Sequence, residues 1–286
     1  MSAGLGLKFV LRGFVVAAVA LLLSGCSAMK LAYENADTFL MWRGGQYFEF
    51  RGAAKEEYAR RVQKFLAWHR RIALPQYAAL ADEAAARLAR GLSQADLIWG
   101  YDAFQVQVRA GLRAAAAETA ELLDALEPAQ IASLERRLAD DNRKFAKDYG
   151  LAKPAGERRK RRVERNVERM EDWLGTVSDE QLERIKLYAA RAPLDEEGRD
   201  RERRRLQREF VLMLRAGEAR ARLAEWAVNW EQRREPEYEK ARRAHREEYQ
   251  GMLLDLDRTL TAAQRAHAVK RLRDFAADFR LLSAGG

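Results

Sequence analysis

Residues 92–126, LSQADLIWGYDAFQVQVRAGLRAAAAETAELLDAL, carry the pattern that decides the fold. Ser93 can accept a hydrogen bond from a backbone N–H of the first helical turn, while Asp96 can reach back to the backbone of Ser93, which makes a capping box. Behind this start, apolar residues recur at steps of three or four, the spacing of one helix face. The members of this stripe are Leu97, Tyr101, Phe104, Val108 and Leu112. The stretch predicts one long amphipathic helix.

The same helix start recurs at residues 126–130, 177–181 and 260–264, where an apolar residue precedes the cap and Gln stands three residues after it. The chain has only five prolines among long runs of Ala, Leu, Arg and Glu, which are strong helix formers. Unequal intervals between the four starts argue against a regular repeat. We therefore expect an all-α protein without β-sheet.

About eight helices are expected, in an elongated antiparallel bundle with apolar stripes inside and charged faces outside. Pro75 predicts a kink or break in the first helix, and Gly217 is a candidate interruption of the sixth. The expected segments are 53–90, 93–126, 128–149, 157–174, 178–192, 195–235, 236–260 and 262–282.

The first 25 residues have the pattern of a secretory signal. Lys8 and Arg12 precede an apolar run of ten residues, 14–23. A run of that length is too short to cross a bilayer as a helix, which takes about 20 residues. The sequence thus divides into a signal peptide (1–25), a lipidated N-terminus with an aromatic-rich first helix (26–52) and one helical domain (53–286).

The signal ends in a lipobox. Leu23, Ser24 and Gly25 precede Cys26, which is the only cysteine of the chain. This order predicts recognition of Leu23-Ser24-Gly25 by signal peptidase II and diacylation of Cys26 through a thioether. An ordinary cleaved signal with a chance cysteine is the alternative.

Lipidation of Cys26 would fix the location of the protein. Two acyl chains anchor a protein stably to a membrane, whereas one does not. Ser27, rather than Asp, follows Cys26. By resemblance to lipoprotein sorting in Gram-negative bacteria, this favours the periplasmic face of the outer membrane, with inner-membrane retention as the alternative. Once Cys26 is acylated, no thiol remains for a disulfide or a metal ligand.

Basic runs are the candidate binding surface. The chain has a formal net charge of +9, and clustered arginines could contact phospholipid, lipopolysaccharide or an acidic protein. Interleaved Glu and Asp at helical spacing favour the alternative of a salt-bridged, solvated face. No nucleic-acid-binding module accompanies the arginines, so nucleic acid is not expected as a partner. The candidate residues are Arg158, Arg159, Lys160, Arg161, Arg162, Arg203, Arg204 and Arg205, with Arg165 and Arg169 beside the first run.

The sequence contains no recognisable catalytic or cofactor motif. His69, His245 and His267 stand alone, without the spacing of metal ligands. No serine lies in a Gly-x-Ser-x-Gly turn. Paired carboxylates such as Glu247-Glu248 could act in glycoside cleavage, but helix surfaces generate such pairs freely. We expect no catalytic residue, no metal and no cofactor.

The segment after Cys26 is unusually aromatic for a tether. It contains Leu31-Ala32-Tyr33-Glu34-Asn35-Ala36-Asp37 and then Trp42. It could lie at the membrane interface, where Trp and Tyr are enriched, or dock as a first helix onto the bundle. Together with the lipobox and the stretch 65–77, it resembles a family of uncharacterised all-helical proteobacterial lipoproteins. That resemblance implies export, lipidation and a helical fold, but no activity.

A second, local resemblance concerns the helix starts. Leu260-Thr261-Ala262-Ala263-Gln264 matches the Leu-Thr-x-x-Gln motif of small periplasmic chaperones and stress sensors, and residues 177–181 nearly do. The same pattern is also an ordinary capping box. The leading hypothesis is a non-enzymatic outer-membrane lipoprotein that contacts an unknown envelope protein or an anionic surface. A chaperone-like or stress-sensing protein is the alternative, followed by an enzyme acting on peptidoglycan or lipid.

Overall fold

The computed structural model describes residues 25–285, and within them the chain forms helices and loops but no strand. Leu23, Ser24 and the apolar run of the predicted signal lie outside the described residues. The α-helices are α2 (Gly25–Glu34), α3 (Ala36–Phe48), α4 (Gly52–Trp68), α5 (Leu74–Ala89), α6 (Gln94–Asp124), α7 (Pro128–Asp148), α8 (Ala155–Leu174), α9 (Asp179–Arg191), α10 (Glu196–Arg215), α11 (Ala219–Val228), α12 (Pro236–Thr259) and α13 (Ala262–Ala284). The all-α prediction is confirmed.

The expected helix count of about eight is too low for the described residues. The predicted helix 53–90 is divided into α4 and α5 by a π-helical segment, His69–Ala73, immediately before Pro75. Proline has no backbone N–H to donate within a helix. The π-helical turn accommodates this missing hydrogen bond, so the helix continues instead of breaking. The predicted helix 195–235 is divided at Gly217, whose φ of +65° ends α10. A short 3₁₀ turn, Trp230–Arg233, follows α11.

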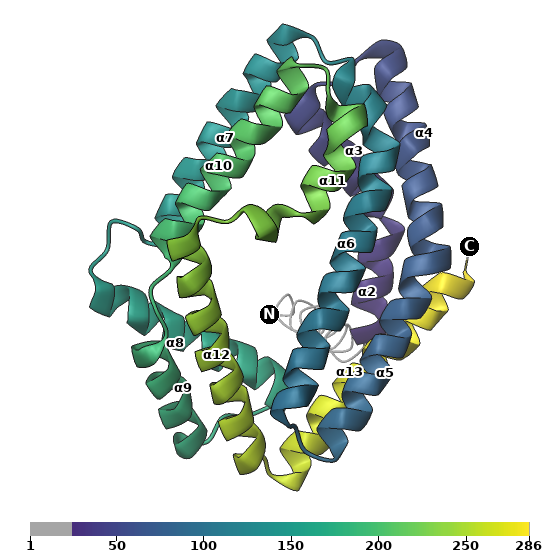
Figure 1. Ribbon diagram of the computed structural model, residues 1–286. Coiled ribbons are helices and arrows are strands. Elements are labelled where there is room, and N and C mark those ends of the chain that lie inside the picture. The colour runs from purple at the N-terminus through teal and green to yellow at the C-terminus, as the bar shows by residue number, and fades with distance from the viewer. Residues whose placement is uncertain (1–24, 286) are drawn as a thin grey trace, which may run out of the picture.

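The helices do not form one solid bundle. They lie along the four sides of a diamond-shaped outline (Figure 1). One side pairs α7 with α10, and the next contains α8, α9 and α12. A third pairs α5 with α13, and the fourth groups α3, α4, α6 and α11. Neighbouring helices such as α7 and α10 run antiparallel, as predicted. The helices as a whole do not form the single bundle that was predicted.

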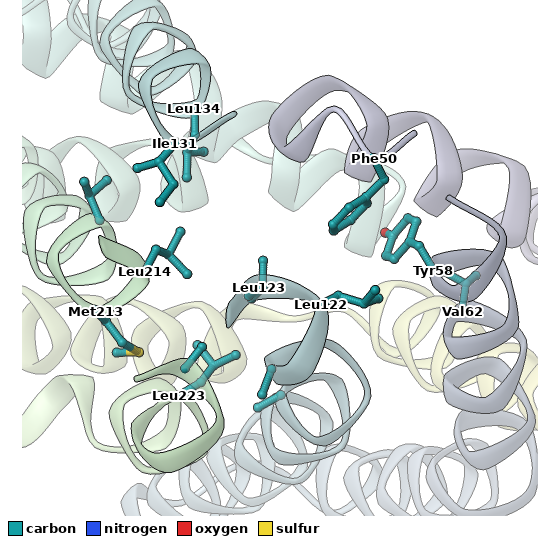
Figure 2. Packing of buried hydrophobic residues seen from close by; sticks show 14 residues of the cluster. Phe50, Tyr58, Val62, Leu122, Leu123, Ile131, Leu134, Met213, Leu214 and Leu223 are labelled. Carbon is teal, nitrogen blue, oxygen red and sulfur yellow. The ribbon is translucent and has the colours of Figure 1, made fainter. Parts of the chain in front are cut away.

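The hydrophobic core is correspondingly split. The largest cluster lies where α4, α6, α7, α10 and α11 meet, and Figure 2 shows Leu122, Leu123, Leu134 and Leu214 within it. A second cluster, around Ile185, joins α8, α9, α12 and α13. Buried alanines on α5 and α13 allow these two helices to pack closely. Each large cluster therefore spans two sides of the diamond: the first joins α7 and α10 to α4, α6 and α11, and the second joins α8, α9 and α12 to α13.

All four predicted capping boxes are present, at Ser93, Glu127, Ser178 and Thr261. In the first, hydrogen bonds from the hydroxyl and the N–H of Ser93 lower the pKa of Asp96 to about 2.

The boxes at Ser178 and Thr261 also pack against each other. Gln181 and Gln264 are buried, and each side-chain amide donates to the other's oxygen over 3.0 Å. Each also donates to a carbonyl beside the other's helix, that of Thr259 or Thr176. The chaperone-like motif here joins α9 to α13 through its glutamines, and the functional likeness remains a prediction.

The aromatic N-terminal segment docks onto the helical body. α3 packs against α4 and α7, and the Tyr58 hydroxyl donates to the carbonyl of Leu40 over 3.0 Å. Gly44 lies directly under the Tyr58 ring, where a Cβ would clash. Leu31, Phe39 and Trp42 remain exposed on the outside. Within residues 25–285, no helix combines the length and apolar character that a membrane span needs.

Candidate anion-binding cavity

A cavity lies at the corner where α8, the start of α10 and α12 meet, and Figure 1 shows where these helices come together. Its volume is about 650 Å³. Arg162, Arg165 and Arg169 share one face of α8, because they are spaced by three and four residues. On α12, Arg242, His245, Arg246 and Tyr249 repeat the same spacing toward the same cavity. Tyr149, Asn166, Tyr188, Asp195, Glu196 and Arg199 complete most of the wall.

Arg162 forms the floor of the cavity and is not free to bind a ligand. Only 3% of its surface is exposed. Its guanidinium donates to the carbonyls of Ala192 and Pro193 over 2.8 and 2.9 Å and to Glu196 Oε1 over 3.2 Å. These bonds fix the loop between α9 and α10 against α8, which places the first turn of α10 at the cavity.

A chain of polar groups forms a second part of the wall. The Tyr188 hydroxyl lies 2.9 Å from Nε2 of His245, whose Nδ1 lies 3.2 Å from Asp195 Oδ1. Arg242 donates to the other oxygen of Asp195 over 3.4 Å. Burial alone would raise the pKa of Asp195, but the neighbouring His245 and Arg242 hold this pKa below its usual range. The carboxylate thereby orients both His245 and Arg242.

Tyr188 is a hydrogen-bonding group rather than a nucleophile. Burial raises the pKa of its hydroxyl to about 12, so the phenol stays protonated at neutral pH.

Four arginines of the cavity have no carboxylate partner among the described residues: Arg165, Arg169, Arg199 and Arg246. Three of them lie over tyrosine rings instead. Arg199 and Arg165 lie 5.0 and 6.0 Å from the ring of Tyr149, and Arg246 lies 4.7 Å from that of Tyr101. The nearby carboxylates are already engaged, Asp148 with Lys144 and Glu196 with Arg162. The cavity therefore concentrates uncompensated positive charge.

Asn166 adds an unsatisfied acceptor to the arginine cavity. It is 5% exposed, and its Nδ2 donates to the carbonyl of Arg162 over 2.7 Å. Its Oδ1 is buried without a hydrogen-bond partner in the described structure. Buried acceptors of this kind are rare in native proteins, because each costs about 1–3 kcal/mol.

The predicted basic surface is largely a network of internal ion pairs. Arg158 pairs with Glu196 and Glu197, and is, like Arg162, turned into the protein. Arg161, Arg204 and Arg205 pair with acidic residues on their own helices, and Arg203 donates to Asn142. Only Arg159 and Lys160 of the eight are exposed without an ion pair in the described chain. Arg162 in particular is wrong as a surface residue, because α10 covers it.

The sequence named Arg165 and Arg169 but missed the groups that face them. Arg199, Arg242 and Arg246 lie 30 or more residues further along the chain, on other helices. The available signal was the repeat of Arg242, His245, Arg246 and Tyr249 at helical spacing. Of the predicted lipidation site, Gly25 and Cys26 lie in the first turn of α2. Within residues 25–285, no three His, Cys, Asp or Glu side chains gather as a metal site.

Residues 46–239 match the model of a family of unknown function, DUF6279. The chain belongs to the DUF6279 family. The matched region includes α7 to α10 and so contains Arg165, Arg169 and Arg199. It ends near the start of α12, before Arg242 and Arg246. No curated protein and no solved structure matches the chain.

Proposed function

We propose that this DUF6279 protein is a lipid-anchored, non-enzymatic binding protein of the cell envelope, which takes an anionic ligand into the arginine cavity. The observation that carries the proposal is the group of four arginines without counterions. Like charges close together repel one another, and an anion between them removes that cost. Guanidinium groups bind phosphate and carboxylate in a bidentate manner, so arginine suits such a site better than lysine.

The openness of the site supports reversible binding. Arg165, Arg169 and Arg199 are exposed to solvent although they line the cavity. The buried side chains of Arg162 and Asp195 hold the wall around these arginines in place. A fixed wall with accessible charged side chains lets a ligand enter without reorganising the fold.

The proposed anchor rests on the lipobox. Cys26 lies in the first turn of α2, which packs against α13 and α3, so acyl chains on this residue would tie the helical body closely to the leaflet. The location we propose is the periplasmic face of the outer membrane.

The anchor predicts a covalent modification. The chain made in Gram-negative cells should begin at Cys26, have the added mass of a diacylated N-terminus and sediment with outer membranes. A Cys26→Ala chain should lack the added mass and should not sediment with outer membranes, because the sequence has no other thiol. Intact-mass spectrometry measures the mass and density-gradient fractionation measures the location, with Ser27→Ala as a control that keeps the lipid. A mature chain with an unmodified Cys26 thiol would contradict the anchor.

The cavity predicts a charge-dependent affinity. Titration calorimetry with inorganic pyrophosphate should show binding that is about 100-fold weaker for the double variant Arg165→Gln, Arg169→Gln, since hydrogen bonds to charged groups contribute about 1.5–3 kcal/mol each. The matched control is Arg159→Gln, Lys160→Gln, which removes the same charge from an exposed part of the same helix. Equal losses in both double variants would mean that only net charge matters and that the cavity is no site.

A further inference from the structure

A second cavity adjoins the arginine cavity. It has a volume of about 310 Å³ and lies between α6, the 3₁₀ turn and the start of α12. Tyr101 and Arg246 line both cavities. Because the guanidinium of Arg246 lies over the ring of Tyr101, these two side chains form the boundary between them. A ligand that extends past this pair would occupy both spaces.

Apart from Asp102 and the shared Arg246, the charged side chains of the second cavity pair with one another. Arg109 donates to Glu231 over 3.0 Å, and Arg234 bonds both Glu231 and Glu239 over 3.1 Å. An anion therefore gains little here. The combined site therefore has one positively charged half, with four arginines that lack an ion pair among the described residues, and one half whose charges are largely paired.

Polar groups of the second cavity offer both donors and acceptors. The Tyr101 hydroxyl donates to Glu231 over 3.1 Å and accepts from Gln105 Nε2 over 2.9 Å. Gln105 Oε1 and Arg109 Nε are buried without hydrogen-bond partners in the described structure. Val106 is the one aliphatic side chain of the lining. Such a wall suits a ligand whose hydroxyls both donate and accept, and it offers no apolar floor to a fatty chain or a nucleobase.

We propose that the two cavities form one site for a phosphorylated saccharide. The phosphoryl group lies among Arg165, Arg169 and Arg199, and the sugar hydroxyls reach Gln105, Arg109 and Glu231 past Arg246. This inference rests on the proposed anion-binding function and adds the ligand class. Asn166 Oδ1, buried in the arginine cavity, accepts a hydroxyl next to the phosphoryl group.

The test compares three soluble probes: inorganic phosphate, which lacks the saccharide, trehalose, which lacks the phosphate, and trehalose 6-phosphate, which has both. Titration calorimetry on the full mature chain should show trehalose 6-phosphate binding about ten-fold or more tightly than phosphate, and no measurable binding of trehalose. Gln105→Leu should reduce the affinity for trehalose 6-phosphate to that for phosphate and leave phosphate binding unchanged. The matched control Gln107→Leu, on the same helix but away from both cavities, should change neither.

A second experiment, with lipid vesicles, distinguishes a lipid-borne ligand from a soluble one. Phosphatidylcholine vesicles that contain diphosphoryl lipid A present a phosphorylated saccharide on a membrane, whereas vesicles that contain phosphatidylglycerol present phosphate without the saccharide. Preference for the lipid A vesicles supports the inference with a lipid-borne ligand, and preference for trehalose 6-phosphate supports it with a soluble one.

The inference and the proposed function can fail separately. If phosphate binds but neither saccharide probe binds more tightly than its matched phosphate probe, the saccharide inference is wrong and the anion site stands. If no anion binds, both are overturned. Phosphate affinity also reports whether Gln105→Leu has folded, because that variant leaves the arginine cavity intact.

Discussion

Replacing Arg162 by Met is expected to lower the free energy of unfolding by about 3–5 kcal/mol, the usual cost of breaking a buried ion pair from one side. The substitution keeps the volume of the aliphatic stem but removes the guanidinium. Glu196, which is 6% exposed, would then lose its bond from Arg162, and the carbonyls of Ala192 and Pro193 would lose their donors. Urea unfolding followed by circular dichroism measures the change.

The control for Arg162 is its neighbour on the same helix. Arg161 is partly exposed and pairs with Glu157 within α8, so Arg161→Met should cost no more than about 0.5 kcal/mol. Adding Glu196→Gln to Arg162→Met should recover part of the loss, because it removes a buried charge that would keep only its 3.7 Å contact with Arg158. Equal stabilities of the two single variants would show that Arg162 does not hold the α9–α10 loop in place.

Replacing Gln181 by Ala is expected to cost about 2–4 kcal/mol, because it removes several hydrogen bonds made by a buried side chain. The partners that lose a bond are the N–H of Ser178, the carbonyl of Thr259 and the side-chain amide of Gln264. The double variant with Gln264→Ala should cost less than the sum of the two single variants, since the partners share their bonds. Thermal and urea unfolding of the four chains gives the coupling energy.

The chain contains a matched pair for this comparison. Gln94 and Gln250 also bond through their amides at 3.0 Å, but on the surface. Gln94→Ala should therefore change stability by about 0.5 kcal/mol or less. If Gln181→Ala behaved like Gln94→Ala, the packed capping boxes would not join α9 to α13.

Helix starts were predictable from the sequence because their bonds are local. A capping box needs only a cap and a residue three positions later, so Ser93, Ser178 and Thr261 could be identified without any knowledge of the fold. The helix count was not predictable to the same degree. Whether Pro75 breaks a helix depends on a π-turn in the preceding residues, which the spacing of apolar residues does not encode.

The candidate site, unlike the helix starts, could not be predicted from local sequence. Arg158, Arg162, Arg165 and Arg169 belong to one basic stretch of α8, and nothing in their local sequence separates them. The first turn of α10 provides Glu196, which pairs with Arg158 and Arg162 but not with the two arginines further along. Helix α12 then closes the cavity with more positive charge.

The sequence by itself determined the helical class, the positions of the helix starts and the lipobox that predicts an anchor at Cys26. Each of these depends on residues within a few positions of one another. The tertiary structure decided that Arg158 and Arg162 of α8 are neutralised, because an ion pair requires a carboxylate within about 4 Å and their partner Glu196 comes from another helix. It also decided where the cores divide and which corner of the diamond remains a positively charged cavity. Charge compensation is a property of the assembled fold, whereas helix capping is a property of five consecutive residues.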